Sequence, residues 1–311
     1  PQPLDPTRPI VLAGEGTSLH ACRVAAGWIA QLSNGAVRPH AIDSHTLARS
    51  TPLRSADQVV VVSHRGKKRF PSEVLARARE LGAATVCISG HGDEAIPADT
   101  VVRTCAQENS ATHTVSYVTA LAALARMALP LGEADLSAVL ADALADAPNA
   151  MEATLAQPAP TGAAERLAAA SPILVTGFDA DAVTADEAAL KIKEGAYRWA
   201  EGMSLEAALH GPVAVYGPDS AAVVIEPAGD DGGRCNDVIR TAGAVGMDLL
   251  RCGPGEVELP FVDASPWVRP LTVVPALQRV VAEMARLRGT NPDTIRTDEE
   301  PWASAIADLM L

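Results

Sequence analysis

The sequence predicts an α/β protein made of two similar halves, each built around a parallel sheet. Short apolar runs alternate along the chain with longer stretches of helical periodicity. The runs are continuously apolar, which is typical of strands that helices cover on both faces of a parallel sheet. The run "SPILVTGFD" at 171–179 has the same character as "RPIVLAGEG" at 8–16, because each leads from an apolar strand into glycine. A chain of 311 residues with 48% hydrophobic residues is long enough for two such domains.

The first predicted half covers residues 1–150. Its strands are apolar runs between turn-forming residues, namely Pro9–Ala13, Gln58–Ser63, Thr85–Ser89 and Val101–Thr104. Its helices have apolar residues at helical spacing, namely Leu19–Leu32, Pro71–Leu81 and Thr114–Leu129. The alanine-rich stretch Glu133–Ala170 is also helical, apart from a break at "QPAPTG", residues 157–162. We expect its second part, residues 151–170, to be a helical linker.

The second predicted half covers residues 171–311 and includes a C-terminal tail. A strand at 171–179 opens it, and a helix at Ala185–Trp199 follows. Three further apolar runs complete its strands, namely Val213–Tyr216, Ala221–Ile225 and Leu249–Arg251. The last helix is Thr272–Leu287. In open parallel sheets ligands bind beyond the carboxyl ends of the strands, so we expect the functional site there.

The composition argues against several classes of partner. The formal net charge of −13 argues against nucleic acid and anionic membrane surfaces, and only 3% of residues are aromatic, too few for base stacking. The five cysteines have no CxxC spacing, which predicts a reducing compartment and no structural zinc. The start "PQPLDPTRP" is polar, and the longest apolar stretch, Val115–Leu131, is interrupted by Arg126 and Pro130. We therefore expect a cytoplasmic protein.

The segment "GEGTSLHA" at 14–21 follows a predicted strand and opens a predicted helix. Backbone N–H groups at Gly16 and beyond, with the hydroxyls of Thr17 and Ser18, suit an anion at a helix start. Leu19 stands where a dinucleotide fingerprint has its third glycine, so a nicotinamide cofactor is not expected. A tight turn with an N-cap serine is the alternative interpretation.

The segment "SHRGKKRF" at 63–70 places four basic residues within five positions at the end of a predicted strand. A solvated basic loop is one interpretation. Lysine, however, occurs only at 67, 68, 191 and 193 in the whole chain. Every other residue of the Lys and Arg type is arginine. This choice favours a need for a compact ammonium group. No Walker motif is present, because Lys67 is followed by Lys68.

The helix "DEAALKIKEGAYRWAEG" at 186–202 carries Glu187, Lys191 and Glu194 at spacings i, i+4 and i+7. They share one face, either as an exposed ion-pair ladder or as a carboxylate beside an ammonium for proton transfer. His210 precedes Gly-Pro and is expected on a loop. The other histidines show no ligand spacing, so no metal site is expected. They are His20, His40, His45, His64, His91 and His113.

These segments resemble, in order, the motifs of the sugar isomerase (SIS) family, and most closely those of the isomerase half of the glucosamine-6-phosphate synthases. "GEGTSLHA" resembles GCGTSxHA, and "SHRGKK" stands where SQSGET is expected. "ENSATHTVSYVTAL" resembles the segment containing ASTKxFTxQL, and "DEAALKIKEGAYRWAEG" resembles LEGALKLKExxYxxAEA. "HGPVAV" corresponds to HGPxAL, and "ALQRVVAEMARLRGTNPDTIR" to PLQLLAYxxAxxxGxxxDxPR.

The resemblance implies tandem flavodoxin-like SIS domains and a sugar-phosphate ligand. It implies that Glu194 is the base that moves a proton between C1 and C2, with Lys191 beside it, and that His210 assists ring opening. It further implies a homodimer with shared active sites, in which His210 comes from the neighbouring chain. The residues expected to bind the sugar or its phosphate are Gly16, Thr17, Ser18, Ser63, His64, Arg65, Lys68, Thr114 and Glu187.

The sequence also departs from the family motifs. His64, Arg65 and Lys68 replace Gln, Ser and Thr of the phosphate loop, and Val115 replaces a lysine. These changes leave open a different anion, such as a carboxylate or a more highly phosphorylated sugar. After "NPDTIR" the chain has no lysine, so imine chemistry with a tail lysine is not expected. No glutaminase half is present, so glutamine-dependent amination by this chain alone is not expected either.

The expected function is aldose–ketose isomerisation of a sugar phosphate through an enediol, or deamination of an amino sugar phosphate coupled to it, without a cofactor. The alternative is a non-catalytic sensor or regulator that binds a phosphosugar. A sensor needs neither a base nor a ring-opening group, and this chain has both Glu194 and His210. The pair therefore favours an enzyme.

Overall fold

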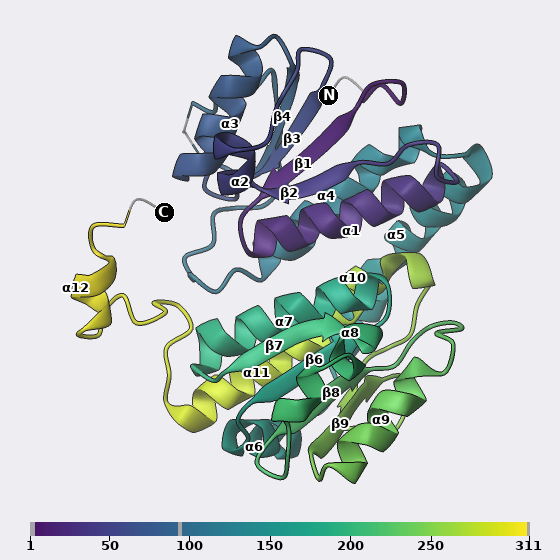
Figure 1. Ribbon diagram of the computed structural model, residues 1–311, viewed down its shortest axis with the longest axis vertical. Coiled ribbons are helices and arrows are strands. Elements are labelled where there is room, and N and C mark those ends of the chain that lie inside the picture. The colour runs from purple at the N-terminus through teal and green to yellow at the C-terminus, as the bar shows by residue number, and fades with distance from the viewer. Residues whose placement is uncertain (1–3, 93–94, 310–311) are drawn as a thin grey trace. The chain divides into compact units, whose positions relative to one another are not determined.

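The computed structural model describes residues 4–92 and 95–309 of the chain (Figure 1). The chain forms two compact units. The first unit comprises Pro1–Asn109, His113–Asp142 and Pro301–Leu311. The second comprises Ser110–Thr112 and Ala143–Glu300.

The sheet of the first unit has five parallel strands in the order β2-β1-β3-β4-β5. This is the order 2-1-3-4-5 found in flavodoxin-like sheets. The strands are β1 (Ile10–Gly14), β2 (His40–Asp43), β3 (Gln58–Val62), β4 (Ala84–Ser89) and β5 (Thr100–Arg103). All five residues of β3 are buried, as expected for a central strand covered on both faces.

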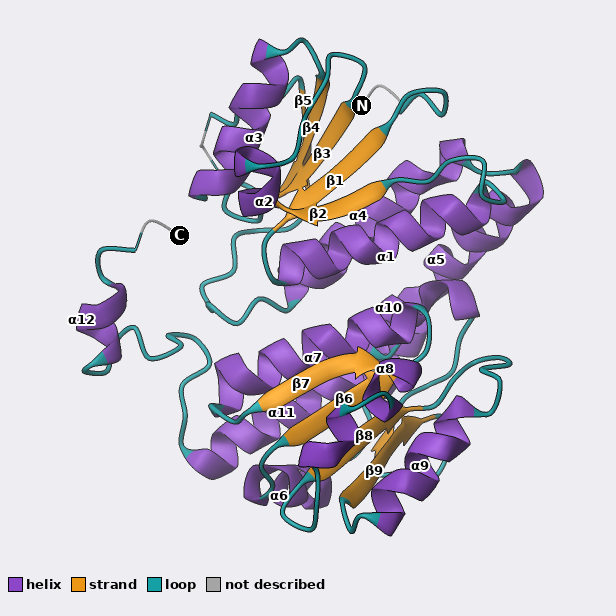
Figure 2. Ribbon diagram, viewed as in Figure 1, coloured by secondary structure: helices purple, strands orange, loops and turns teal. Residues whose placement is uncertain are grey.

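Helices cover both faces of this sheet (Figure 2). Two of them, α1 (Thr17–Leu32) and α4 (Val115–Ala128), pack together on one face. The other face carries α2 (Ser44–Arg49) and α3 (Arg69–Glu80), which also pack together. The short 3₁₀ helix η1 (Leu129–Leu131) then leads into α5 (Ala134–Leu155), which runs from the first unit into the second.

The sheet of the second unit repeats this topology. Its five parallel strands lie in the order β10-β9-β8-β6-β7, which is again 2-1-3-4-5 when counted from β6. The strands are β6 (Ile173–Gly177), β7 (Ala200–Ser204), β8 (Ala221–Ile225), β9 (Asp248–Gly253) and β10 (Leu259–Pro260). The repetition matches the two similar halves that the sequence predicts.

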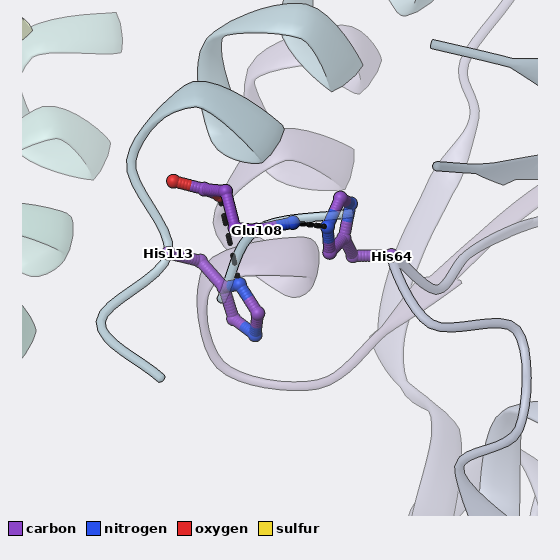
Figure 3. A group of neighbouring side chains, drawn as sticks. All are labelled: His64, Glu108 and His113. Atoms are coloured by element: carbon purple, nitrogen blue, oxygen red, sulfur yellow. Dashed lines mark hydrogen bonds and ion pairs between the residues drawn. The ribbon is translucent and has the colours of Figure 1, made fainter. Parts of the chain in front are cut away.

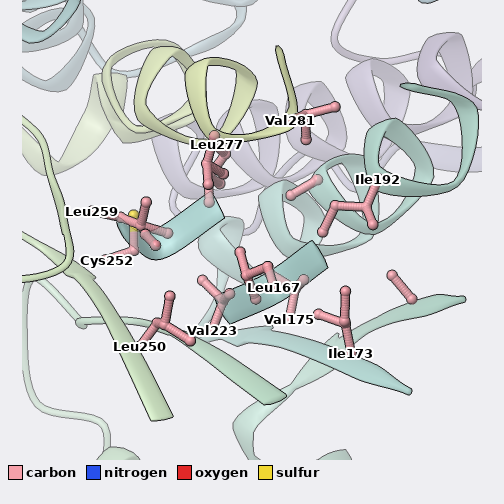
Figure 4. Close-up of a cluster of buried hydrophobic side chains, with 14 of the residues drawn as sticks. Leu167, Ile173, Val175, Ile192, Val223, Leu250, Cys252, Leu259, Leu277 and Val281 are labelled. Atoms are coloured by element: carbon pink, nitrogen blue, oxygen red, sulfur yellow. The ribbon is translucent and has the colours of Figure 1, made fainter. Parts of the chain in front are cut away.

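The main core of the second unit lies between the sheet and three helices on one face. These are α6 (Thr161–Ala169), α7 (Ala180–Ala196) and α11 (Val274–Arg288). Figure 4 shows Val175 of β6 and Val223 of β8 facing Leu277 of α11 across this core. The remaining helical segments are α8 (Leu205–Leu209), η2 (Pro212–Val215), α9 (Arg234–Ala244), η3 (Pro266–Val268), α10 (Arg269–Thr272) and α12 (Trp302–Ile306).

Several predicted elements differ from the structure. The run Val213–Tyr216, predicted as a strand, is instead the 3₁₀ helix η2, because Pro212 at its first turn favours helical geometry. The predicted helix Ala185–Trp199 begins earlier, at Ala180, and ends at Ala196, where Tyr197 adopts a left-handed conformation with φ 51°. The strands β2 and β7 and the helices α2 and α9 were not predicted.

Residues 161–169, predicted as part of a linker, form α6 and belong to the second unit. Ala163, Ala164 and Leu167 of this helix are buried in the main core of that unit. The predicted break in the alanine-rich stretch is confirmed, since α5 ends at Leu155 and α6 begins at Thr161. Across residues 4–92 and 95–309, no helix combines the length and the apolar character needed to cross a bilayer.

Candidate functional site

The loop between β1 and α1 lies at the carboxyl edge of the first sheet and contains Gly16, Thr17 and Ser18. A Cβ atom on Gly14 would lie 2.6 Å from the carbonyl carbon of Ser18, so only glycine allows the helix to start so close to the strand. Gly16 has φ 51°, which also favours glycine. The first turn of α1 therefore faces the expected site edge.

Glu15 of the same loop has a structural contact that the sequence did not reveal. Its Oε1 accepts a hydrogen bond of 2.9 Å from the backbone N–H of His45, in the first turn of α2. Burial raises the pKa of Glu15, while the hydrogen bond from His45 and the charge of Lys68 act in the opposite direction. Glu15 thus ties the β1–α1 loop to the next helix of the unit.

The loop after β3 brings Ser63, His64, Arg65 and Lys68 to the same edge of the sheet. The Ser63 side chain is buried, and its hydroxyl has no hydrogen-bond partner among the described residues. The carbonyl of His64 accepts hydrogen bonds from the N–H of Gly90 at 2.9 Å and from the Ser89 hydroxyl at 3.1 Å. The backbone of the loop is therefore fixed to the end of β4.

His64, Glu108 and His113 form a cluster at this edge (Figure 3). His64 Nε2 accepts a hydrogen bond of 3.0 Å from the backbone N–H of Glu108, and His113 Nδ1 lies 3.7 Å from Glu108 Oε2. The two imidazole rings lie 5.2 Å apart, centroid to centroid. Burial lowers the pKa of His64, and the charges of His113 and Arg65 lower it further against an opposing effect of Glu108. His64 is therefore neutral at pH 7, as its role as an acceptor requires.

Glu108 caps the start of α4. Its carboxylate accepts hydrogen bonds from the backbone N–H groups of Thr114 at 3.0 Å, Val115 at 3.0 Å and Ser116 at 2.8 Å. The hydroxyls of Thr114 and Ser116 also donate to it. Burial alone would raise the pKa of Glu108, but the nearby His113 side chain and the hydrogen bonds from Ser116 and Thr114 outweigh it and lower the pKa far below the ordinary range. The carboxylate is therefore ionised at all physiological pH values.

The second unit holds Glu187, Lys191 and Glu194 on one face of α7, as their spacing predicts. Lys191 Nζ donates to Glu194 Oε2 at 2.7 Å and lies 3.3 Å from Glu187 Oε1. Lys191 and Glu187 are each only 2% exposed, whereas the Glu194 side chain is 22% exposed. The cluster is therefore not a surface ladder: one carboxylate neutralises the buried ammonium from inside, and the other reaches solvent.

His210 lies at the end of α8 and is largely exposed. Its Nε2 is 2.6 Å from Glu206 Oε1, and Arg234 binds the same carboxylate through Nε at 2.6 Å. The hydrogen bonds from His210 lower the pKa of Glu206, with a further contribution from Arg234. Among the described residues, no hydrogen bond or ion pair joins His210 to Glu194.

The topology of the second unit separates Glu194 from His210. A Cβ on Gly202, in the middle of β7, would meet the backbone of Asp186, so α7 crosses β7 at that point. Glu194 lies eight residues further along α7, about 12 Å toward the amino edge of the sheet. His210 follows the carboxyl end of β7, on the other side. The two predicted catalytic groups therefore lie toward opposite ends of the same strand.

Glu108 and His113 were not singled out as site residues from the sequence. They stand in the segment "ENSATHTVS" before α4, whereas His64 is 44 residues earlier, so no local spacing links the three. The available signal was topological: both segments follow strands of one parallel sheet, and the carboxyl ends of parallel strands share an edge.

Comparisons with known proteins agree with this architecture. Residues 4–129 match the family described as SIS domain. The glutamine–fructose-6-phosphate aminotransferase (isomerizing) of Streptomyces coelicolor is 30% identical over 263 residues, which are 76% of this chain and 42% of that protein. The chain spans about half the length of the curated relatives it matches.

Two solved structures share the fold. The C-terminal domain of glucosamine-fructose-6-phosphate aminotransferase from Francisella tularensis has a TM-score of 0.80 at 19% identity, covering 93% of this chain and 86% of that one. Tagatose-6-phosphate ketose/aldose isomerase from Escherichia coli has a TM-score of 0.73 at 16% identity, covering 94% and 86%. At these identities the likeness establishes the fold.

Proposed function

The chain carries a SIS domain of the sugar isomerase family, and on that premise we propose that it isomerises a sugar phosphate between its aldose and ketose forms. The resemblance read from its motifs is confirmed by the family match and by its aminotransferase relatives. The observation that carries the proposal is the cluster on α7, in which a buried lysine holds the one accessible carboxylate, Glu194, at 2.7 Å.

Glu194 acts as the base in this proposal. It takes the proton from C2 of the open-chain aldose, the C–H electron pair forms the C1–C2 double bond, and the C1 oxygen gains a proton to give the enediol. Return of the proton from Glu194 to C1, with loss of the C2 hydroxyl proton, gives the ketose. Lys191 orients the Glu194 carboxylate and places its positive charge beside it. Glu187 neutralises the Lys191 ammonium group from the buried side.

The carboxyl edge of the first sheet binds the phosphate in this proposal. Arg65 and Lys68 supply positive charge, and the start of α1 supplies N–H groups with the hydroxyls of Thr17 and Ser18. The buried hydroxyl of Ser63, which has no partner within residues 4–92 and 95–309, supports a ligand at this edge, because such groups are rarely left without a partner. Thr114 also lies at this edge, where its hydroxyl donates to Glu108.

His210 assists ring opening in this proposal and is contributed by a second copy of the chain. The separation of Glu194 and His210 along β7 supports this arrangement, since one copy of the second unit does not pair them. The exposure of His210, and of the apolar Val215 after it at 68%, is consistent with an interface between copies. The proposed assembly is a homodimer with shared sites.

Ligand stabilisation tests the binding half of this proposal. The melting temperature is measured with fructose 6-phosphate, tagatose 6-phosphate and an amino sugar phosphate, each against its unphosphorylated sugar and against inorganic phosphate. We expect at least one sugar phosphate to raise the melting temperature, because a ligand that binds only the folded state stabilises it. Its parent sugar is expected to have no comparable effect. A panel in which no sugar phosphate stabilises the protein contradicts the proposal.

A non-catalytic phosphosugar sensor is the second candidate function. The observation that favours it is the departure of His64, Arg65 and Lys68 from the phosphate loop of the family motif. A sensor gives the same stabilisation without turnover. Deamination of an amino sugar phosphate uses the same proton transfer, and release of ammonia from the amino sugar phosphate in the panel distinguishes it from isomerisation alone.

A further inference from the structure

We propose that His64, Glu108 and His113 form a binding site for a divalent transition-metal ion of the zinc type. One ring nitrogen from each histidine and one carboxylate oxygen all lie within 4.8 Å of one another. Two imidazoles and one carboxylate are a ligand set that Zn²⁺ uses in proteins with one position open for water or substrate. The inference concerns binding of the ion and does not depend on the proposed isomerase function.

The distances require only a small closure of the cluster. Ligand atoms around a tetrahedral Zn²⁺ lie about 3.3–3.6 Å apart, given metal–ligand bonds of about 2.0–2.2 Å. His113 Nδ1 and Glu108 Oε2 are already 3.7 Å apart. The remaining separations, at most 4.8 Å, therefore close by about 1 Å, within reach of side-chain rotation.

The contacts of the three groups suit a cation. Zn²⁺ binds neutral imidazoles and ionised carboxylates. His113 Nδ1 is a buried nitrogen with no hydrogen-bond partner among the described residues, 3.7 Å from Glu108 Oε2, where an ion between the two groups could bind both. His64 is already an acceptor at Nε2, so its ring is neutral. The Glu108 carboxylate is ionised and held in place by the first turn of α4, an orienting support that metal ligands generally have.

Existing hydrogen bonds at His64 and Glu108 change when the ion binds. The ion replaces the Glu108 N–H as the partner of His64 Nε2, or binds Nδ1 after a ring flip. At Glu108 the hydroxyls of Thr114 and Ser116 are the donors that can rotate away, whereas the backbone N–H groups remain. A metal with short, directional bonds compensates for these losses; a hydrated alkaline-earth ion does not.

The location of the cluster means that a bound ion would lie beside the proposed anion site. His64 lies between Ser63 and Arg65 in the loop after β3, where positive charge gathers. In the SIS motifs, Gln and Ser stand at the positions of His64 and His113, so both potential ligands are departures from the motif at the same edge. A bound divalent ion adds positive charge there and has an open position for an anionic oxygen.

Direct metal binding tests this inference. The protein is freed of metal with a chelator, dialysed and titrated with Zn²⁺, with Co²⁺ as a spectroscopic probe and Mg²⁺ as a control. The variants are His64→Gln, His113→Ser and the double variant, which take the residues of the motif. The matched control is His40→Gln. It removes an exposed histidine at the start of β2, where the amino ends of the strands lie, away from the cluster at their carboxyl ends. Circular dichroism verifies that each variant is folded.

We expect one Zn²⁺ per chain, the visible absorption of a tetrahedral Co²⁺ site and a rise in melting temperature with Zn²⁺. Either single substitution is expected to lower the Zn²⁺ affinity by at least about 100-fold and to abolish the Co²⁺ spectrum. Loss of a group that only supports a ligand costs up to about 100-fold, and loss of a ligand itself should cost at least as much. The His40→Gln variant keeps both. If the wild-type chain binds Zn²⁺ no more tightly than the double variant, the proposal is wrong. The same conclusion follows if His40→Gln weakens binding as much as His64→Gln or His113→Ser.

Discussion

The side chains of Arg65 and Lys68 have no hydrogen-bond or ion-pair partner among the described residues, although the chain carries a net charge of −13. Arg69, one position after Lys68, pairs with Glu73 at 3.1 Å. Cations left without partners in an acidic protein create local positive potential that attracts anions. The sequence indicated this loop through its unusual lysines, but it did not show that Arg69 is paired with Glu73, four residues later in α3.

At the residue scale, Arg65→Ala tests anion recognition. A charge-assisted hydrogen bond contributes about 1.5–3 kcal/mol, so the dissociation constant of the stabilising sugar phosphate is expected to rise more than ~10-fold. Added salt is expected to weaken wild-type binding and to affect the variant less. Arg69→Ala, which removes an arginine already paired with Glu73, is the control and is expected to keep its affinity. Equal loss of affinity for the unphosphorylated sugar would show that Arg65 does not bind the phosphate.

At the element scale, the central strands and long helices could be predicted, while short elements at the margins could not. β3 and β8 are continuously buried apolar runs and were predicted nearly residue for residue. β7 reads "AEGMS" and lies at an edge of its sheet, so it lacks the apolar run that marks a central strand. No strand was predicted there. The cluster of His64, Glu108 and His113 depends on loops from separate strands, which no local pattern encodes.

The cap of α4 leads to a prediction at the same scale. Glu108→Gln removes a charged acceptor from the first turn of the helix and is expected to lower the free energy of unfolding at pH 7 by about 1–2 kcal/mol. The pKa of Glu108 is lowered by folding, so its contribution is full above the ordinary value of 4.5 and declines as pH falls below it. Urea titrations should therefore show a smaller difference between wild type and variant at pH 3 than at pH 7. A difference that grows as the pH falls contradicts this role.

At the scale of the whole molecule, the two units repeat one topology but carry different chemistry. The first presents cations and a helix start at its sheet edge, and the second carries the buried lysine and its carboxylates on α7. The separation of Glu194 from His210 along β7 has a consequence for the assembly. If each site takes its histidine from a second copy, inactive variants can complement one another.

Mixing Glu194→Gln with His210→Ala tests the shared site. Each homodimer is expected to be nearly inactive. Random exchange at equal amounts gives about half heterodimers, each with one intact and one doubly damaged site, so about a quarter of wild-type activity is expected to return. Native mass spectrometry of the mixture verifies that subunits have exchanged. Confirmed exchange without any recovery of activity would place both residues in a site formed by one chain.

The most direct test of the central claim is exchange of solvent deuterium into the sugar phosphate that stabilises the protein, measured by NMR in D₂O at the hydrogen whose removal forms the enediol: the C1 hydrogen of a ketose or the C2 hydrogen of an aldose. This exchange reports enediol formation whatever the final product. We expect the wild type to exchange this hydrogen and Glu194→Gln to retain ligand stabilisation while exchange falls about 10²–10⁴-fold, as for loss of a general base. Glu194→Leu is the matched variant that also removes one of the carboxylate partners of Lys191 and leaves Glu187. No exchange in the wild type with a stabilising ligand, or undiminished exchange in Glu194→Gln, would contradict the assignment of Glu194 as the base of a sugar-phosphate isomerase.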